Sequence, residues 1–303
     1  MNVLITSAAA KIPLIEMFKA VENCTVIAAD SDPTCLASNV ADIFEPLPLD
    51  NDPMYREILL NICKQHSIQL IIPTRDAELP LLLSMKATLH DMGICLPLPD
   101  KEALDICLDK IAFYEFCLRE GFPVLPRLYG VQPLSCFARH RFGAGGRDSF
   151  KLLPNTPLKD ADDYLIQPIC TDPEYSCDLL MDFTGKPVQA VVRERQKITG
   201  GESWQTQVVD IPTLTEMAIN IGKKLGLKGH NLIQFFYCPD TGPYVIEVNA
   251  RFGGASYLSI KAGLNSPGQL MRMVNGETAN PKTIQIGLSS QKTDNGVIRY
   301  HAP

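Results

Sequence analysis

Short apolar runs alternate with stretches of helical periodicity over the first hundred residues. The runs at 2–6, 25–29 and 68–72 are too continuously apolar for half-exposed strands, and apolar residues recur at helical spacing in 12–21 and 54–66. Buried strands that alternate with helices form a parallel sheet covered by helices. We therefore expect a Rossmann-like α/β layer over residues 1–97. The turn after the first run lacks G-x-G-x-x-G, which disfavours a dinucleotide site there.

The rest of the chain, residues 98–303, predicts an α+β arrangement. Residues 100–121 have helical spacing and end on a glycine, as helices often do. Strand-like runs follow at 135–140, 164–169, 177–182 and 188–194, and the last two are joined by the turn sequence D-F-T-G-K. These runs predict a small antiparallel lid at about 133–184. A helix at 213–226 and a hairpin of 232–237 with 244–248, joined by C-P-D-T-G-P, complete the pattern.

Composition narrows the class of protein. The chain has 303 residues, a formal net charge of −6 and a pI near 5.4, which argues against a nucleic-acid-binding or membrane-surface protein. Its ten cysteines are scattered without a C-x-x-C pair and are expected to be reduced and mostly buried. No apolar stretch reaches about 18 residues and no leader pattern is present, so we expect a cytoplasmic protein.

The terminal hairpin carries the strongest chemical signal. In Y-V-I-E-V-N-A-R-F-G-G, Glu247, Asn249 and Arg251 alternate and so share one face of a strand. Gln234, on the partner strand, can project onto the same face if the hairpin pairs. Three oxygen donors in one patch suit Mg²⁺. Arg251 is then placed to stabilise negative charge on a transferring phosphoryl group.

Two further segments carry candidate chemistry. F-A-R-H-R-F-G-A-G-G-R, residues 137–147, joins a strand bearing Arg139 to a glycine loop whose backbone N–H groups can close over phosphates. L-I-Q-P-I-C-T-D-P-E, residues 165–174, is extended and ends in an acid. Each motif has a simpler alternative, because alternating polar residues are usually a solvated face and glycine loops are usually turns. Asp30, Asp32 and Asp76 at strand ends are expected to be helix caps, and the five histidines structural or exposed.

The order and spacing of these motifs resemble the ATP-grasp superfamily over essentially the whole chain. Among its members the sequence is most similar to single-module relatives of the carbamoyl-phosphate synthase large subunit. The resemblance implies an N-terminal pre-ATP-grasp layer, an ATP-grasp fold that holds ATP between two subdomains, and ATP and Mg²⁺ (or Mn²⁺) as cofactors. It also implies small-molecule carboxylate and amine substrates and a possible homodimer, with no nucleic-acid or membrane partner.

The resemblance also implies roles for particular residues, each at a position that matches a family motif. Gln234, Glu247 and Asn249 are the expected metal ligands. ATP is expected to contact Lys110, Arg139, Gly143, Gly145, Gly146, Gln167, Ile169 and Glu174. The γ-phosphate and the substrate are expected to contact Arg251, Arg195 and Arg193. Pro168 is compatible with an adenine hinge that uses the carbonyl of Gln167 and the N–H of Ile169.

The sequence departs from the family in its lid, which is short on both sides of the glycine loop. The function that the resemblance implies is an ADP-forming ligase that activates a carboxylate as an acylphosphate for attack by an amine or a thiol. Two alternatives stay open: a nucleotide-binding protein without turnover, which the reduced lid favours, and a carbamoyl-phosphate synthase-like phosphorylation of bicarbonate or carbamate. A nicotinamide oxidoreductase is the least favoured.

Overall fold

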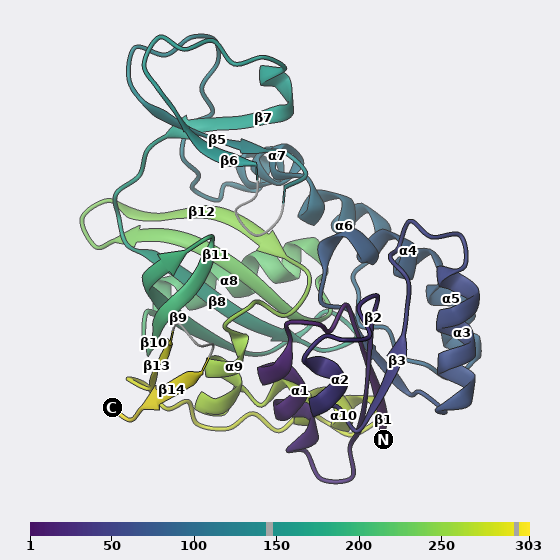
Figure 1. The fold of residues 1–303 in the computed structure, drawn as a ribbon. Coiled ribbons are helices and arrows are strands. Elements are labelled where there is room, and N and C mark those ends of the chain that lie inside the picture. The colour runs from purple at the N-terminus through teal and green to yellow at the C-terminus, as the bar shows by residue number, and fades with distance from the viewer. Residues whose placement is uncertain (144–147, 294–296) are drawn as a thin grey trace.

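The computed structural model describes residues 1–143, 148–293 and 297–303, and its N-terminal layer is a parallel sheet between helices (Figure 1). The strands lie in the order β3 (Ile43–Pro46), β2 (Thr25–Asp30), β1 (Asn2–Thr6), β4 (Leu70–Ile72). All of its ladders are parallel, which confirms the predicted sheet. The sequence analysis missed β3, because its four residues are only partly buried and end in proline.

Helices connect and cover these strands. They are α1 (Ile12–Lys19), α2 (Ala37–Val40), α3 (Tyr55–Gln65), the 3₁₀ turn η1 (Asp76–Glu78), α4 (Leu79–Ser84) and α5 (Lys86–Asp91). The predicted helices at 12–21 and 54–66 are therefore present as α1 and α3.

Two helices lead out of this layer where the sequence predicts one. They are α6 (Lys101–Leu108) and α7 (Lys110–Glu120), and the break between them falls on Asp109, which has extended backbone angles. The Asp109 carboxylate accepts hydrogen bonds from the backbone N–H groups of Ile111 (3.0 Å) and Ala112 (3.3 Å), and so caps α7. Helical periodicity continues across the break, so only the cap reveals it.

The lid is a separate three-stranded sheet that stands over the rest of the molecule (Figure 1). Its strands lie in the order β6 (Ser149–Leu152), β5 (Cys136–His140), β7 (Tyr164–Pro168), with one 3₁₀ turn, η2 (Ala161–Asp163), before β7. A small core of Cys136, Ala138, Leu152 and Ile166 lies behind it. Within its described residues the lid has no α-helix, in line with the predicted reduction.

The largest element is a seven-stranded antiparallel sheet. Its order is β12 (Gly242–Asn249), β11 (Gly229–Cys238), β8 (Glu174–Met181), β9 (Pro187–Thr199), β10 (Glu202–Val209), β13 (Ser289–Lys292), β14 (Ile298–His301). The predicted runs at 177–182 and 188–194 belong here as β8 and β9, not to the lid. Their placement follows from pairing, because β8 lies beside β11 along eight residues.

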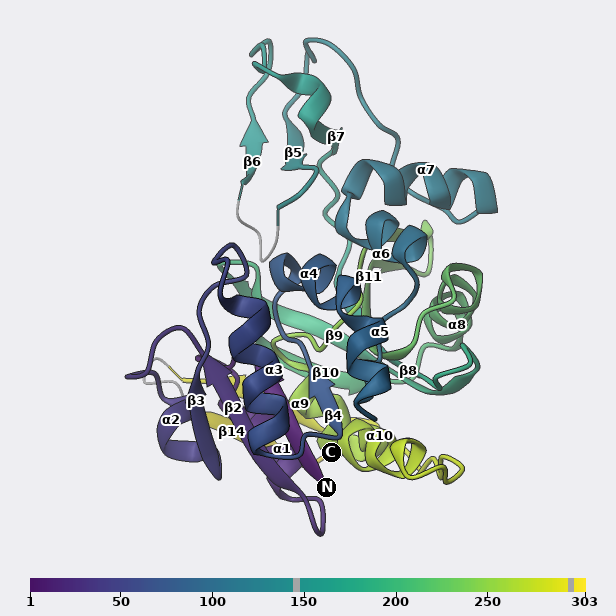
Figure 2. The ribbon, with the colours of Figure 1, turned by 90° about the vertical axis from the view of Figure 1, so that its right-hand side faces the viewer.

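The two faces of the large sheet have different partners. One packs against α8 (Pro212–Leu225) and α7 through a core that includes Cys177, Ile233 and Val248. The other is covered at one end by α9 (Ser256–Ser259) and the π-helical turn η3 (Ile260–Leu264). Both α9 and the following α10 (Ser266–Val274) contact α1. Figure 2 shows this second face turned toward the N-terminal layer, with the lid above both. None of the helices in the described residues has the length and hydropathy of a membrane span.

Candidate functional site

The hairpin of β11 and β12 brings the predicted oxygen donors onto one surface. Gln234 lies directly opposite Glu247 in the ladder, beside a β-bulge. The amide of Asn249 donates to Glu247 Oε1 over 3.4 Å. Residues on the other face of these strands, such as Ile233 and Val248, are buried against α8. Alternation therefore directs Gln234, Glu247 and Asn249 to the side that faces the lid and the N-terminal layer.

The two glycines after this strand allow a tight turn. A Cβ on Gly253 would lie 2.7 Å from Leu232 Cδ2, while the backbone N–H of Gly253 donates to Ser256 Oγ over 2.8 Å. The chain can therefore reverse against β11 and begin α9. This turn holds Arg251 at the end of the strand instead of letting the strand continue.

Arg251 reaches across to the N-terminal layer. Its Nε donates to Asp76 Oδ1 over 2.7 Å, and its Nη2 forms a second bond with the other carboxylate oxygen. The same Nη2 donates to Asn249 Oδ1 over 3.1 Å. Asp76 follows β4, and the sequence analysis took it for a helix cap. The sequence did contain a signal for a functional role of Asp76: P-T-R-D directly follows a buried strand, and ligand sites of parallel sheets lie at the carboxyl ends of the strands.

Arg195 on β9 forms hydrogen bonds with side chains around the hairpin. Its Nη1 donates to Glu174 Oε2 over 2.6 Å and to Gln234 Oε1 over 3.4 Å, and its Nε donates to Ser203 over 3.0 Å. The side chain of Arg195 is 6% exposed and that of Glu174 is 29% exposed. Glu174, predicted to bind ribose, is therefore held by a guanidinium within the same site.

The lid contributes Arg139, which spans the gap between lid and sheet. Its Nη2 donates to Gln167 Oε1 over 2.7 Å, and its Nη1 donates to the carbonyl of Ile246 on β12 over 3.2 Å. The Arg139 guanidinium also lies 4.0 Å from the Glu247 carboxylate. Ile169, just past the end of β7, is 42% exposed. The Arg139 side chain thus links β7 of the lid to β12 of the large sheet.

Lys110, at the start of α7, bonds the loop that follows β5 of the lid. Its backbone N–H donates to the carbonyl of Arg141 over 2.9 Å, and its ammonium donates to the carbonyl of Gly143. Arg141 in turn pairs with Asp109, the residue that caps α7. The start of α7 is therefore fastened to the lid loop. Two further predicted residues, Gly145 and Gly146, lie outside the described residues.

The electrostatics of this cluster favour an anionic ligand. Four cations (Lys110, Arg139, Arg195, Arg251) gather around three carboxylates (Glu174, Glu247, Asp76). Burial lowers the pKa of Lys110, of Arg139 and of Arg195, and Glu247 nearby raises each pKa in part. Cations that are buried with too few carboxylates to balance their charge are typical of a site that binds an anion.

Arg193 does not join this group. Its side chain is 1% exposed and donates to Asp178 Oδ2 over 2.7 Å, to Ser259 over 3.0 Å and to Thr206 over 3.3 Å. Asp178 is fully buried and also contacts His230 (3.1 Å). Helix α9 lies over this part of the sheet and therefore buries Arg193. The alternation of residues along β9 would by itself leave this side chain exposed. The position of Arg193 favours a structural role over the predicted contact with substrate.

Comparison with known proteins agrees with this architecture. Residues 3–96 match the family described as "PylC-like, N-terminal domain", and residues 160–295 match "ATP-grasp in the biosynthetic pathway with Ter operon". Residues 160–295 thus match an ATP-grasp family, and the chain has the ATP-grasp fold. A search of curated proteins found no significant match. The predicted resemblance to the superfamily is thereby confirmed, while the finer likeness to carbamoyl-phosphate synthase stays a prediction.

Solved structures share the ATP-grasp fold at low sequence identity. A biotin carboxylase from Campylobacter jejuni in complex with β,γ-ATP is 17% identical, with 95% of this chain and 74% of that chain covered and a TM-score of 0.72. N5-carboxyaminoimidazole synthetase from Staphylococcus aureus complexed with ADP is 14% identical, with coverage of 96% and 82% and a TM-score of 0.75.

A third match contains both nucleotide and magnesium. It is the biotin carboxylase domain dimer of the 2-oxoglutarate carboxylase from Hydrogenobacter thermophilus, in complex with MgADP, ADP and bicarbonate. It is 15% identical, with coverage of 95% and 73% and a TM-score of 0.72. The predicted fold, a Rossmann-like layer followed by an ATP-grasp fold, is confirmed by these matches. The domain boundary at 97/98 and the start of the lid near residue 133 stay predictions.

Proposed function

We propose that the protein is an ADP-forming ligase that uses ATP to activate a small carboxylate, which an amine or a thiol then attacks. The observation that carries the proposal is the single cluster of Lys110, Arg139, Arg195 and Arg251 around the Gln234–Glu247–Asn249 patch. The matched structures that hold ATP, ADP or bicarbonate support it, because they share this fold. The same cluster would suit bicarbonate as the carboxylate.

The oxygen donors fit a divalent cation of the hard type. Gln234, Glu247 and Asn249 supply one carboxylate and two amide oxygens, and such oxygens are the ligands that Mg²⁺ prefers. Each now faces a cation: Arg195 lies 3.4 Å from Gln234, Arg251 lies 3.1 Å from Asn249, and Arg139 lies 4.0 Å from Glu247. Bound Mg²⁺ would neutralise charge on the ATP phosphates there. With a single carboxylate the site would bind the metal weakly without nucleotide.

The remaining residues act by position and charge. Lys110 and Arg139 would neutralise the phosphates from the lid side, and the Gln167–Ile169 segment would border the adenine. A substrate carboxylate oxygen attacks the γ-phosphorus, the bond to the β-phosphate oxygen breaks, and ADP leaves with the electron pair. Arg251 is placed to stabilise the transferred charge. The nucleophile then attacks the acylphosphate carbonyl and phosphate departs. In this sequence of steps no side chain of the protein forms a covalent bond with the substrate.

Removal of the Glu247 charge tests the proposal. Glu247→Gln is expected to abolish ADP release from MgATP over pooled amino acids and small carboxylates, while Glu216→Gln, on the exposed side of α8, should leave the rate unchanged. Thermal shift with MgATP and with a non-hydrolysable analogue measures binding separately. A Glu247→Gln rate equal to the wild-type rate would refute the site.

The reduced lid favours one alternative, a nucleotide-binding protein without turnover. With three strands in its described residues, the lid offers little surface to close over ATP. The same experiment separates the two functions, because a MgATP-dependent thermal shift without ADP release from any carboxylate pool would support the alternative. A homodimer and a cytoplasmic location remain predictions.

A further inference from the structure

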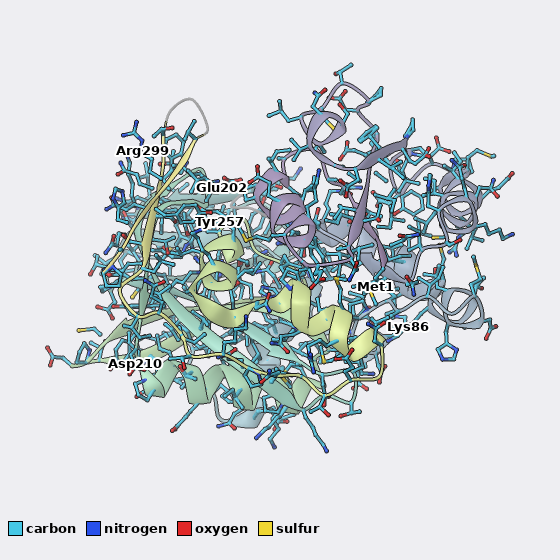
Figure 3. The ribbon with its side chains drawn as sticks, turned by 90° about the horizontal axis from the view of Figure 1, so that it is seen from below. Met1, Lys86, Glu202, Asp210, Tyr257 and Arg299 are labelled. Atoms are coloured by element: carbon cyan, nitrogen blue, oxygen red, sulfur yellow. The ribbon has the colours of Figure 1, made fainter. Side chains whose placement is uncertain are left out.

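The turn after the E-x-N-x-R strand, residues 252–256, is held by buried hydrogen bonds. Ser256 Oγ accepts a hydrogen bond from the backbone N–H of Gly253 over 2.8 Å and donates one to Asp178 Oδ1. One hydroxyl thus joins the turn to a carboxylate on β8. Figure 3 shows Tyr257, the next residue of α9, beside the helices of the N-terminal layer. The turn therefore lies where the large sheet meets that layer.

His230 on β11 supports the same turn. Its Nε2 lies 3.1 Å from Asp178 Oδ1 and 3.2 Å from Ser256 Oγ, and its Nδ1 lies 2.9 Å from Ser266 Oγ. Its ring stacks on the ring of Phe252, with the centroids 3.9 Å apart and an angle of 6° between the planes. Because both ring nitrogens are hydrogen-bonded, the plane of the imidazole is fixed, and the stack fixes the plane of Phe252 in turn.

Phe252 connects this network to Arg251. The Phe252 ring also meets the ring of Phe18 on α1 edge-on, with the centroids 6.1 Å apart. Arg251 Nη1 donates to the backbone carbonyl of Phe252 over 3.2 Å. The cavity that Arg251, Phe252 and His230 line measures about 10 Å³, which is room for one water at most. The rings therefore pack closely, so a shift of Phe252 would displace the carbonyl that Arg251 bonds.

The two oxygens of the Asp178 carboxylate have different partners. Oδ2 accepts hydrogen bonds from Arg193 over 2.7 Å and from Ser259 over 2.5 Å, and Arg193 also supplies the balancing charge. Oδ1 accepts from Ser256 and lies next to His230. The Oδ1 side therefore adds direction to the packing, because hydrogen bonds fix one geometry of the turn where apolar contacts would accept several.

We propose that Asp178, His230 and Ser256 are positioning residues. Through the turn they hold the Arg251 guanidinium in the orientation that γ-phosphoryl transfer needs, and because all three are buried they touch neither nucleotide nor substrate. The inference rests on the proposed function, in which Arg251 stabilises the transferred charge. Asp76 restrains the guanidinium from the N-terminal layer, and the network restrains the backbone from the sheet, so the side chain is oriented before nucleotide binds.

Two serine variants separate this role from a contribution to folding alone. Ser256→Ala removes the hydroxyl that joins the turn to Asp178. Ser290→Ala is the matched control, because both serines are 1% exposed and Ser290 Oγ also meets α9, at 3.3 Å from the Tyr257 hydroxyl. Both variants are expected to lower the stability of the protein, since each loses a buried hydrogen bond. Only Ser256→Ala is expected to change Arg251.

The Nε–H group of Arg251 reports its orientation without any ligand. In the wild type it donates to Asp76 Oδ1 over 2.7 Å, and its ¹⁵N resonance can be assigned by its absence from Arg251→Met. Ser256→Ala should speed its exchange with water at least about tenfold, the equivalent of one hydrogen bond. Ser290→Ala should leave the resonance and its exchange unchanged. An Arg251 resonance that Ser256→Ala leaves as in the wild type would overturn the inference.

Kinetics test whether the network acts through Arg251. Ser256→Ala should lower kcat for ADP release at least about tenfold, because a displaced charge stabilises the transition state less. ADP has no γ-phosphate, so the Kd of MgADP should change less than about twofold, whereas a general loss of structure would weaken MgADP as well. In the Arg251→Met background, Ser256→Ala should lower kcat less than about twofold further.

The outcomes distinguish this inference from the proposed function. If Ser256→Ala lowers kcat equally with and without Arg251, the network acts by another route and the inference is wrong, while the proposed function stands. Retained ADP release in Glu247→Gln would instead refute the proposed function. The exchange of the Arg251 Nε–H would then still decide whether the network positions this side chain.

Discussion

Replacement of Arg193 by methionine distinguishes a structural residue from a catalytic one. The guanidinium is 1% exposed, its partner Asp178 is 0% exposed, and its donors also reach Ser259 and Thr206. Arg193→Met keeps most of the aliphatic volume but leaves a buried carboxylate without its cation. Loss of one partner of a buried ion pair costs about 3–5 kcal/mol. For a chain of this length, that cost corresponds to a fall of roughly 5–8 °C in the unfolding temperature.

The dependence on pH adds a second measurement. Burial by itself raises the pKa of Asp178, but Arg193 and the hydrogen bond with His230 hold it well below its usual range. A carboxyl with a depressed folded pKa contributes stability above its unfolded pKa, near 3.8, and loses that contribution as the pH falls through the folded pKa. The difference between wild type and Arg193→Met should therefore be full at pH 7 and shrink below about pH 4.

Chemical denaturation followed by circular dichroism is the assay, with ADP release measured on the same samples. Lys197→Met, an exposed site on the same strand, is the matched control and should cost less than about 0.5 kcal/mol. The double variant Asp178→Asn/Arg193→Met removes both charges and should lose less than the sum of the single losses. If Arg193→Met unfolds like the wild type but loses ADP release, Arg193 acts on substrate and our structural assignment is wrong.

Three further predictions follow from other contacts. Asp76→Asn should lower kcat/KM for ADP release at least about tenfold, because Arg251 loses its bidentate partner; unchanged kinetics would contradict this role. Gly229→Ala should destabilise the protein by about 1–3 kcal/mol on chemical denaturation, because Gly229 has a φ of +66° and its Cβ would lie 2.8 Å from Pro97; wild-type stability would show that the contact relaxes freely. Burial raises the pKa of Cys95 to about 11, so this thiol should react with a disulfide reagent at pH 8 far more slowly in the native than in the unfolded protein, and equal rates would refute its burial.

The sequence alone determined the elements whose signal is local. Continuous apolar runs revealed three of the four parallel strands, and alternation in E-V-N-A-R placed Glu247 and Asn249 on one face. Pairing through the C-P-D-T-G-P turn then set Gln234 opposite Glu247, as the hairpin signal predicts. These features succeed because strand periodicity and turn chemistry are properties of neighbouring residues. The order of the motifs also indicated the fold, since connectivity is itself part of the sequence.

Tertiary structure decided which of these residues meet. Arg193 and Arg195 have the same alternation, yet α9 covers Arg193 while Arg195 reaches Glu174 in the site. The membership of β8 in the large sheet depended on its pairing with β11, which begins at Gly229, well after β8 ends at Met181. Asp76 meets Arg251 across 175 residues of chain. Burial and charge pairing arise from segments distant in sequence, so the pattern of any one segment cannot determine them.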